Sequence, residues 1–181
     1  MGKRSDFERR DRDFYPTPMS AVIPLRSHLP DEFEYIEPCA GAGDLIDHLS
    51  WFGGRCVSAF DIEPMREDIK VGDAFTETLG QLIITNPPWD RELLHGMIDR
   101  FTDGQDCWLL FDADWMHTKQ ASQFLSLCRK VVSVGRVKWI PDSKMTGKDN
   151  CCWYYFSRQG EGTTFYGRES TRSFEPRLSF A

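Results

Sequence analysis

The sequence predicts an α/β fold in which helices cover both faces of a mainly parallel β-sheet. Short apolar runs typical of strands alternate with segments whose apolar residues recur at helical spacing. Several of the runs are almost entirely apolar, which is typical of strands buried on both faces. The ligand crevice of such a sheet lies beyond the carboxyl ends of its strands, so we expect the functional residues there.

Five strands are predicted along the chain, with helices between them. The strands are the apolar runs 33–36, 56–60, 82–84, 107–111 and 131–134. Three helices are predicted where apolar residues share one helical face, and these residues are Leu45, Ile46, Leu49 and Phe52, then Leu93, Leu94, Met97, Ile98 and Phe101, then Phe124, Leu125 and Cys128. Residues 134–140 and 151–157 flank a polar connection and are predicted to pair as a hairpin at the edge of the sheet.

Length and composition indicate one compact domain, because the chain has 181 residues and a hydrophobic fraction of 40%. We predict a domain over residues 1–158 that begins with a charged segment at 1–12, followed by a loosely attached polar tail over 159–181. The sequence contains no run of about 18 uncharged apolar residues, and its first residues are charged. We therefore expect a cytoplasmic protein that does not bind membranes.

Cysteine spacing and net charge exclude several function classes. None of the six cysteines forms a Cys-x-x-Cys pair, so we expect neither a metal site nor a disulfide framework. The formal net charge of -6 argues against a protein that coats nucleic acid by bulk electrostatics. Residues 128–150 nevertheless contain six basic and two acidic residues, which is typical either of a solvated surface or of a local phosphate contact.

The loop from Glu37 to Asp44 is the first ligand signal, since it follows a predicted strand and precedes a predicted helix. Its glycines, Gly41 and Gly43, permit a sharp turn and the close approach of a ligand. A dinucleotide fingerprint needs a third glycine, but Ile46 occupies that position. The carboxylates of Glu37 and Asp44 repel a pyrophosphate and attract a ligand that carries an ammonium and a sulfonium group. S-adenosylmethionine carries both groups and is the predicted cofactor.

Two further acids are placed where an adenosine needs them. Asp61 ends the second predicted strand, where an acid accepts hydrogen bonds from ribose hydroxyls. Asp73 follows a glycine and is predicted to accept from the adenine amino group. Each acid taken alone is better explained as a solvated loop residue or a helix cap. Their order and spacing favour the ligand, and their neighbours Ile62 and Ala74 are included in the predicted site.

The most informative motif is Asn86-Pro87-Pro88-Trp89, which follows the predicted strand 82–84. The two prolines stiffen the turn and leave the carbonyl of Pro87 free to point into the crevice. That carbonyl and the side-chain carbonyl of Asn86 are predicted to accept from an exocyclic amino group, while the indole of Trp89 stacks on a planar ring. Their dipoles stabilise the positive charge that develops when such a nitrogen attacks a methyl group. A proline-rich turn before a capped helix is the simpler explanation of the motif taken alone.

These motifs together resemble the class I S-adenosylmethionine-dependent amino-methyltransferases. Asn86-Pro87-Pro88-Trp89 after Glu37-Pro38-Cys39-Ala40-Gly41-Ala42-Gly43 is similar to that family, and Asp13-Phe14-Tyr15-Pro16-Thr17-Pro18 is similar to phage and prophage DNA adenine-N6 methyltransferases. The resemblance covers roughly residues 13–157 and implies a Rossmann-like, seven-stranded sheet with an antiparallel edge hairpin. It also implies methyl transfer to adenine N6 in DNA, in bacterial or phage-infected host cells.

The resemblance places the segment before the glycine loop near the methionine part of the cofactor. It assigns this role to Tyr15, Thr17 and Pro18, although a helix with Thr17 as N-cap and Pro18 at its first position explains these residues equally well. The complete predicted cofactor set is Tyr15, Thr17, Pro18, Glu37, Cys39, Ala40, Gly41, Gly43, Asp61, Ile62, Asp73 and Ala74. The predicted catalytic residues are Asn86, Pro87, Pro88 and Trp89.

DNA is the predicted partner, although the chain lacks the separate target-recognition domain of larger family members. An adenine in a duplex must be flipped out, and stacking on an aromatic ring offsets part of that cost. The loop over 138–150 combines cations with an aromatic residue, so its Lys138, Lys144, Thr146 and Lys148 are predicted to contact DNA. Residues 114–119 are a second candidate segment.

Other substrates fit the same motifs. The Asn-Pro-Pro-aromatic sequence also resembles RNA guanine-N2 and protein glutamine-N5 methyltransferases, and cytosine N4 is a close variant of the target. A non-catalytic, methyltransferase-like module that binds nucleic acid is a further alternative. The presence of Asn86 and of the acidic cofactor residues argues against that module.

Overall fold

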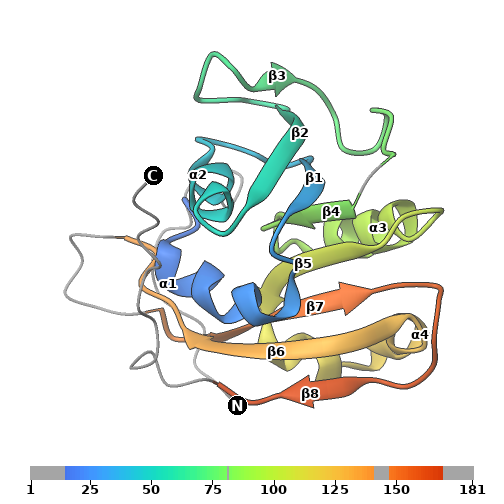
Figure 1. The fold of residues 1–181 in the computed structure, drawn as a ribbon. Helices are drawn as coiled ribbons and strands as arrows, with labels where there is room; N and C mark the ends of the chain where they lie inside the picture. The colour runs from blue at the N-terminus through green and yellow to red at the C-terminus, as the bar shows by residue number, and fades with distance from the viewer. Residues whose placement is uncertain (1–14, 81, 141–146, 169–181) are drawn as a thin grey trace.

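The computed structural model describes residues 15–80, 82–140 and 147–168. One eight-stranded sheet runs through it in the order β3-β2-β1-β4-β5-β7-β6-β8 (Figure 1). Its strands are β1 (Phe33–Glu37), β2 (Gly54–Asp61), β3 (Lys70–Val71), β4 (Leu82–Thr85), β5 (Cys107–Asp112), β6 (Cys128–Arg136), β7 (Asn150–Phe156) and β8 (Thr164–Tyr166). Neighbouring strands are parallel except where β7 pairs with β5 and β6. The predicted α/β class and mainly parallel sheet are confirmed.

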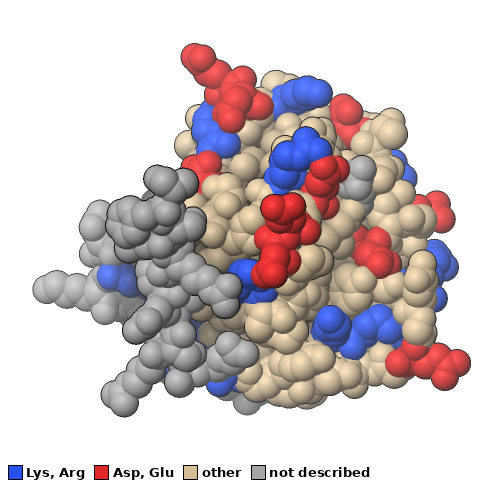
Figure 2. Space-filling model, in the orientation of Figure 1, with Lys and Arg blue, Asp and Glu red and all other residues tan. Residues whose placement is uncertain are grey.

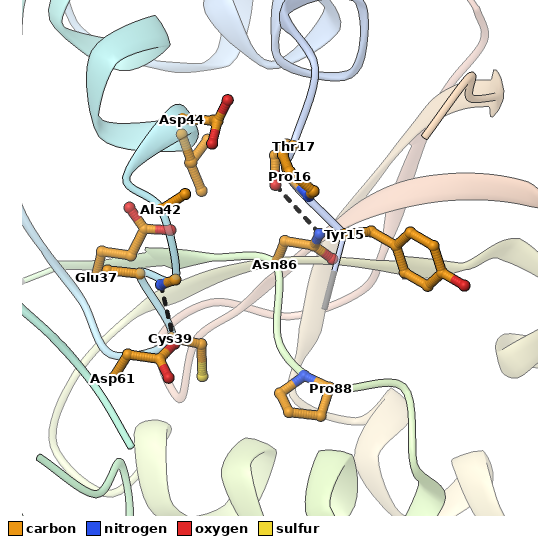
Figure 3. A pocket seen from close by; sticks show the side chains of 13 residues that line it. Tyr15, Pro16, Thr17, Glu37, Cys39, Ala42, Asp44, Asp61, Asn86 and Pro88 are labelled. Atoms are coloured by element: carbon orange, nitrogen blue, oxygen red, sulfur yellow. Dashed lines mark hydrogen bonds between the residues drawn. The ribbon is translucent and has the colours of Figure 1, made fainter. Parts of the chain in front are cut away.

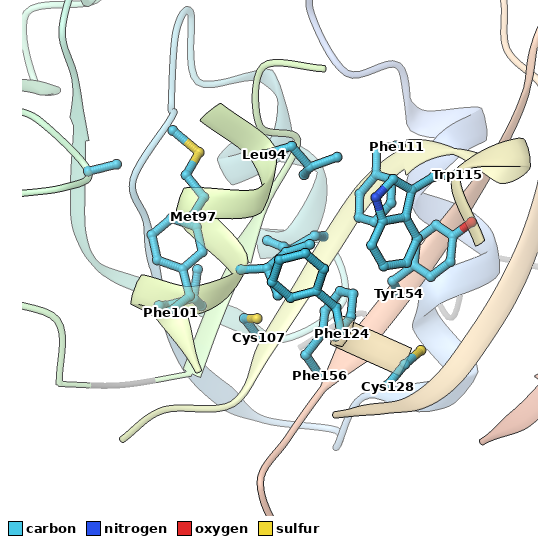
Figure 4. Packing of buried hydrophobic residues seen from close by; sticks show 14 of the residues in the cluster. Leu94, Met97, Phe101, Cys107, Phe111, Trp115, Phe124, Cys128, Tyr154 and Phe156 are labelled. Atoms are coloured by element: carbon cyan, nitrogen blue, oxygen red, sulfur yellow. The ribbon is translucent and has the colours of Figure 1, made fainter. Parts of the chain in front are cut away.

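Helices cover both faces of the sheet. They are α1 (Met19–Val22), α2 (Asp44–Ser50), α3 (Arg91–Phe101) and α4 (Ser122–Leu125), with short 3-10 helices η2 (Ile23–His28), η3 (Ala113–His117) and η4 (Lys119–Ala121). Successive residues of a strand point to opposite faces, and in β4 Ile83 packs with α3 while Ile84 packs with α1 and α2. Figure 4 shows the α3 side, where Met97 and Phe101 lie near Phe156 and other aromatic residues. In the described part of the chain, no helix is long and apolar enough to cross a membrane.

The sheet differs from the prediction at its carboxyl-terminal edge. It has eight strands instead of seven, because Thr164–Tyr166 pairs in parallel with β6. The expectation of a loosely attached tail from residue 159 is therefore wrong for this segment. Its backbone pairing is supported by the Thr163 hydroxyl, which donates to the carbonyl of Cys128 at 2.7 Å, and by Tyr166, whose ring packs against His28. Three residues within a polar stretch give no recognisable alternation.

The antiparallel hairpin is confirmed, but its limits shift. The runs 131–134 and 134–140 were expected as separate strands, whereas β6 is continuous from Cys128 to Arg136. Cys128 consequently begins β6 and does not close the helix of Phe124, which ends at Leu125. The strand β3 carries only two residues, too few for a periodic pattern.

Helix α3 follows the Asn86-Pro87-Pro88-Trp89 turn, and its first turn is capped by Asp90. The Oδ1 atom of Asp90 accepts from the backbone N–H groups of Glu92 (3.0 Å) and Leu93 (3.2 Å). We expect Asp90→Ala to lower the free energy of unfolding by about 1 kcal/mol, because these donors lose their acceptor. Urea denaturation measures this loss, with Asp99→Ala on the exposed side of the same helix as control. Equal effects of the two substitutions would contradict the cap.

Candidate functional site

A pocket opens at the carboxyl ends of β1, β2 and β4, between the loop before α2 and the segment before α1 (Figure 3). Four separate stretches of chain meet there, as expected for the crevice of a parallel sheet. The lining residues are Tyr15, Pro16, Thr17, Glu37, Cys39, Ala40, Gly41, Ala42, Asp44, Leu45, Asp61, Asn86 and Pro88. The acids Glu37, Asp44 and Asp61 lie on one side, and Asn86 and Tyr15 lie on the other (Figure 3).

Glu37 contributes a buried carboxyl group to the pocket. The last residue of β1 is only 2% exposed, and its Oε2 atom has no hydrogen-bond partner in the described part of the chain. Burial raises the pKa of this carboxyl group well above its ordinary value, the charge of Asp61 raises it further, and Arg66 opposes them. A buried acceptor without a donor costs free energy. A cationic donor placed in the pocket would satisfy the Oε2 atom and offset that cost.

The glycine loop turns sharply around this carboxylate. Gly41 and Gly43 have positive φ angles of 52° and 82°, which other residues adopt at a cost. The N–H of Gly41 donates to Oδ2 of Asp61 at 2.9 Å. Gly43 lies under the guanidinium of Arg66, which a Cβ atom at this position would overlap, and it does not line the pocket. Arg66 is held there by Asp47 at 2.9 Å.

Asp61 and Asp73 make local hydrogen bonds to the backbone. Besides the bond from Gly41, Asp61 accepts from the N–H of Glu63 at 2.8 Å. Asp73 accepts from the N–H of Phe75 at 2.9 Å in an exposed turn outside the pocket. Such backbone bonds are the ones expected if the two acids are loop residues or helix caps. Asp61 also lines the pocket. Each carboxylate oxygen retains a lone pair for a ligand, so both roles remain predictions.

Seven of the twelve predicted cofactor residues line the pocket and five do not. The seven are Tyr15, Thr17, Glu37, Cys39, Ala40, Gly41 and Asp61, and the five are Pro18, Gly43, Ile62, Asp73 and Ala74. Among the five, Ile62 is 58% exposed and Ala74 packs in the core beside α3. The lining residues that the prediction did not include are Pro16, Ala42, Asp44 and Leu45. Pro16, Ala42 and Asp44 adjoin predicted residues, and Leu45 follows Asp44, which the acidic flank of the loop already indicated.

Asn86 lies between the acidic side of the pocket and Tyr15, with its side chain bonded at both ends. Its Nδ2 atom donates to the hydroxyl of Thr17 at 3.1 Å, and its Oδ1 atom accepts from the indole N–H of Trp89 at 3.2 Å. The N-cap alternative for Thr17 is wrong, since Pro18 caps α1 and no side-chain hydrogen bond supports the cap. Thr17 instead is buried and lines the pocket.

Of the three residues after Asn86, only Pro88 lines the pocket. Pro87 is buried. Trp89 is half-buried and packs against both hydrophobic clusters of the core. Its ring meets that of Trp139 edge to face, with centroids 5.7 Å apart. The indole therefore lies beside the pocket and packs into the core.

The predicted DNA-contacting residues are described in part. Lys138 and Lys148 are exposed at the two ends of the β6–β7 connection, which the hydrogen bond from Gly147 N–H to Val137 C=O holds together at 2.8 Å. Lys144 and Thr146 lie outside the described residues. On the face shown in Figure 2, the described basic and acidic residues are interspersed. The Lys138 and Lys148 contacts remain predictions.

The pocket does not present a cysteine nucleophile. Burial raises the pKa of the Cys39 thiol far above its ordinary value, and the charges of Asp61 and Glu37 raise it further. The group is therefore a neutral thiol at physiological pH. Within the described ranges, no cluster of three histidine, cysteine or acidic side chains is arranged to hold a metal ion.

No protein-family model and no curated protein matches the sequence. Solved structures do resemble it. A candidate RNA methyltransferase from Pyrococcus horikoshii has a TM-score of 0.59 and 17% identity, with 86% of this chain and 93% of that chain covered. A candidate class I S-adenosylmethionine-dependent methyltransferase from Listeria monocytogenes has a TM-score of 0.56 and 9% identity, with 91% and 68% covered.

A third structure is a modification subunit of a candidate type I restriction enzyme from Vibrio vulnificus, with a TM-score of 0.53, 10% identity and 90% of this chain covered. This chain spans 49% of the length of that subunit. The sheet order and these likenesses show that the chain has the Rossmann-like fold of class I methyltransferases. A likeness at such low identity concerns the fold alone.

Proposed function

We propose that this chain is an S-adenosylmethionine-dependent methyltransferase that methylates adenine N6 in DNA. The observation that carries the proposal is the placement of Asn86. Its carboxamide lies in the wall of the pocket, between the acidic side, where the buried Oε2 atom of Glu37 has no hydrogen-bond partner among the described residues, and the aromatic ring of Tyr15 (Figure 3). A cationic donor and a planar amine would therefore approach the same side chain from its two sides.

The residues of the pocket fit the cofactor. The unpartnered Oε2 atom of Glu37 is suited to the ammonium group of its methionine part, and the surrounding acids suit a ligand with two positive groups. Asp61 lines the pocket and Asp73 does not, so the adenosine end of the cofactor is expected to extend from the pocket over Asp61 toward Asp73. When bound, S-adenosylmethionine supplies a methyl group on a sulfonium leaving group.

Asn86 supplies the electrostatic part of the reaction. Its Oδ1 atom, and in our proposal the carbonyl oxygen of Pro87, accept hydrogen bonds from the target amino group. These dipoles stabilise the positive charge that appears on the nitrogen as its lone pair forms the bond to carbon. The electron pair of the broken carbon–sulfur bond stays on sulfur, and the nitrogen then releases a proton to water. A protein nucleophile is not needed, in keeping with the neutral Cys39 thiol.

Adenine in DNA is supported by the motifs and by one of the similar folds. The segments around Tyr15 and Asn86 resemble those of phage DNA adenine-N6 methyltransferases, and a restriction-enzyme modification subunit has a similar fold. RNA is the second candidate, because the Pyrococcus structure described as an RNA methyltransferase is similar over nearly its whole length. Both substrates present a planar ring with an exocyclic amino group.

The experiment that tests the proposal has two stages. Calorimetric titration with S-adenosylmethionine establishes binding. Labelled cofactor is then offered in parallel with duplex DNA, single-stranded DNA, RNA and release factor, and the product is digested to nucleosides. We expect N6-methyladenine in DNA. Label on guanine N2 in RNA, on cytosine N4 or on glutamine would show that this group, and not adenine N6 in DNA, is the methyl acceptor. Cofactor binding without transfer to any of the substrates would support a binding module.

The exposed lysines Lys138 and Lys148 lead to a prediction about salt dependence. Each phosphate contact releases a counterion, so Lys138→Ala and Lys148→Ala are each expected to reduce the slope of log K against log salt concentration by about 0.9. Fluorescence anisotropy with duplex DNA at several salt concentrations measures the slope. Lys70→Ala, on β3 at the other edge of the sheet, is the control. If the slopes of the Lys138→Ala and Lys148→Ala variants equalled that of Lys70→Ala, the β6–β7 connection would not contact DNA.

A further inference from the structure

We propose that Trp89 is a positioning residue that fixes the carboxamide of Asn86, through its indole N–H, in the orientation that presents oxygen to the target amine. This inference deepens the proposed function and rests on it. The geometry behind it is a chain of hydrogen bonds: Trp89 Nε1 donates to Asn86 Oδ1 at 3.2 Å, and Asn86 Nδ2 donates to Thr17 Oγ1 at 3.1 Å.

The two hydrogen-bond partners of the Asn86 carboxamide differ in which orientations of that group they allow. An indole N–H only donates, whereas a hydroxyl donates or accepts. If the carboxamide rotated by half a turn, its NH2 group would face the N–H of Trp89, and two donors would oppose each other. The Thr17 hydroxyl would adapt to the rotated form by donating. Trp89 therefore selects the orientation of Asn86, and Thr17 supports it.

The indole is itself fixed in the sheet. Its N–H also lies 3.2 Å from the carbonyl oxygen of Leu110 in β5, so one donor is shared between two acceptors. The ring packs against both hydrophobic clusters, and Trp139 lies edge to face against it. The position of Asn86 is thereby tied to β5 as well as to β4, which ends at the preceding residue. A carbonyl oxygen has two lone pairs, so Oδ1 can accept from Trp89 and from a target amine together.

This role differs from that of a stacking platform and predicts a different result for one substitution. Trp89→Phe keeps an aromatic ring but removes the N–H. A positioning role predicts that kcat falls about ten- to a hundredfold, while KM for DNA and Kd for the cofactor change by less than about threefold. A stacking role predicts kcat and KM close to those of the wild type, and such a result would overturn the inference.

Two controls distinguish the effect of losing the hydrogen bond from a general effect of the substitution on the structure. Trp51→Phe makes the same change at a ring that is 77% exposed and should leave every parameter unchanged. Thr17→Val removes the acceptor of Asn86 Nδ2 and should lower kcat at saturating cofactor, whereas Thr17→Ser keeps a hydroxyl and should restore kcat. Because Thr17 also lines the pocket, cofactor affinity is measured separately, and a wild-type kcat in Thr17→Val would contradict the chain of hydrogen bonds.

A measurement that does not depend on methyl transfer tests this inference separately from the proposed function. The chain has six tryptophans, and the indole N–H signal that disappears from the nitrogen–proton spectrum of Trp89→Phe identifies Trp89. We expect this proton to exchange with solvent much more slowly than that of Trp51. Exchange as fast as that of Trp51 would overturn the hydrogen bond. If the wild type transfers no methyl group to any substrate, the proposed function fails, and the exchange rate in Asn86→Ala decides whether the hydrogen bond exists: faster exchange than in the wild type supports the bond, and an equal rate contradicts it.

Discussion

Glu37→Gln is expected to weaken S-adenosylmethionine binding by about a hundredfold or more, because the proposed buried charge pair with the cofactor is lost. The stability of the free protein is expected to stay the same or to rise at neutral pH. Burial makes the ionised form of Glu37 costly in the free protein, and no donor from the described residues reaches its Oε2 atom. Calorimetry measures the affinity, and thermal denaturation of the free protein measures the stability.

The same carboxyl group gives a pH dependence with a defined sign. The folded protein holds the proton of Glu37 to a higher pH than the unfolded chain does, because the pKa is raised well above its ordinary value. The contribution of Glu37 to stability is thus complete at low pH and declines as the pH rises from about 4.5 through the folded pKa. Cofactor affinity should increase over the same range, since the ammonium group pairs with the ionised form.

The pH series also supplies the control. Glu37→Gln should remove both pH dependences, whereas Glu34→Gln, an exposed position on the same strand that pairs with Arg55, should retain them. Cofactor binding by Glu37→Gln at wild-type affinity would show that the ammonium group is held elsewhere. The acidic side of the pocket would then need a different explanation.

Asn86→Ala is expected to reduce turnover by about a hundred- to a thousandfold, the range found when one donor or acceptor for a developing charge is removed. Cofactor affinity should stay within a few fold, because Asn86 faces the target amine in our proposal. Single-turnover methylation with labelled cofactor measures the rate, and calorimetry measures the affinity. The Trp89 N–H retains Leu110 as an acceptor, so the fold should survive the change.

Asn86→Asp is the matched second variant. It keeps an oxygen toward the N–H of Trp89, and the Thr17 hydroxyl can donate to the other oxygen. We expect it to retain more activity than Asn86→Ala. If Asn86→Ala lost turnover and cofactor affinity equally, Asn86 would belong to the cofactor site and its proposed role would be wrong.

Local patterns in the sequence were sufficient for the central sheet and for the glycine loop. Strands such as β4 and β5 are almost entirely apolar runs, and the predicted α2 and α3 have apolar residues at helical spacing. The acids that surround the loop are neighbours in the chain or end adjacent parallel strands, so their convergence follows from topology. The short strands β3 and β8 were missed because two or three residues carry no period.

The sequence by itself determined the α/β class, the antiparallel pairing near its end and the acidic character of the loop, because each depends on spacing within a few residues. The tertiary structure decided what the Asn86 side chain contacts. Its hydrogen bond to Thr17 joins residues 69 positions apart, and the bond from Trp89 to Leu110 spans 21. A sequence lists donors and acceptors, but only the packing of strands and helices brings particular ones within hydrogen-bond distance.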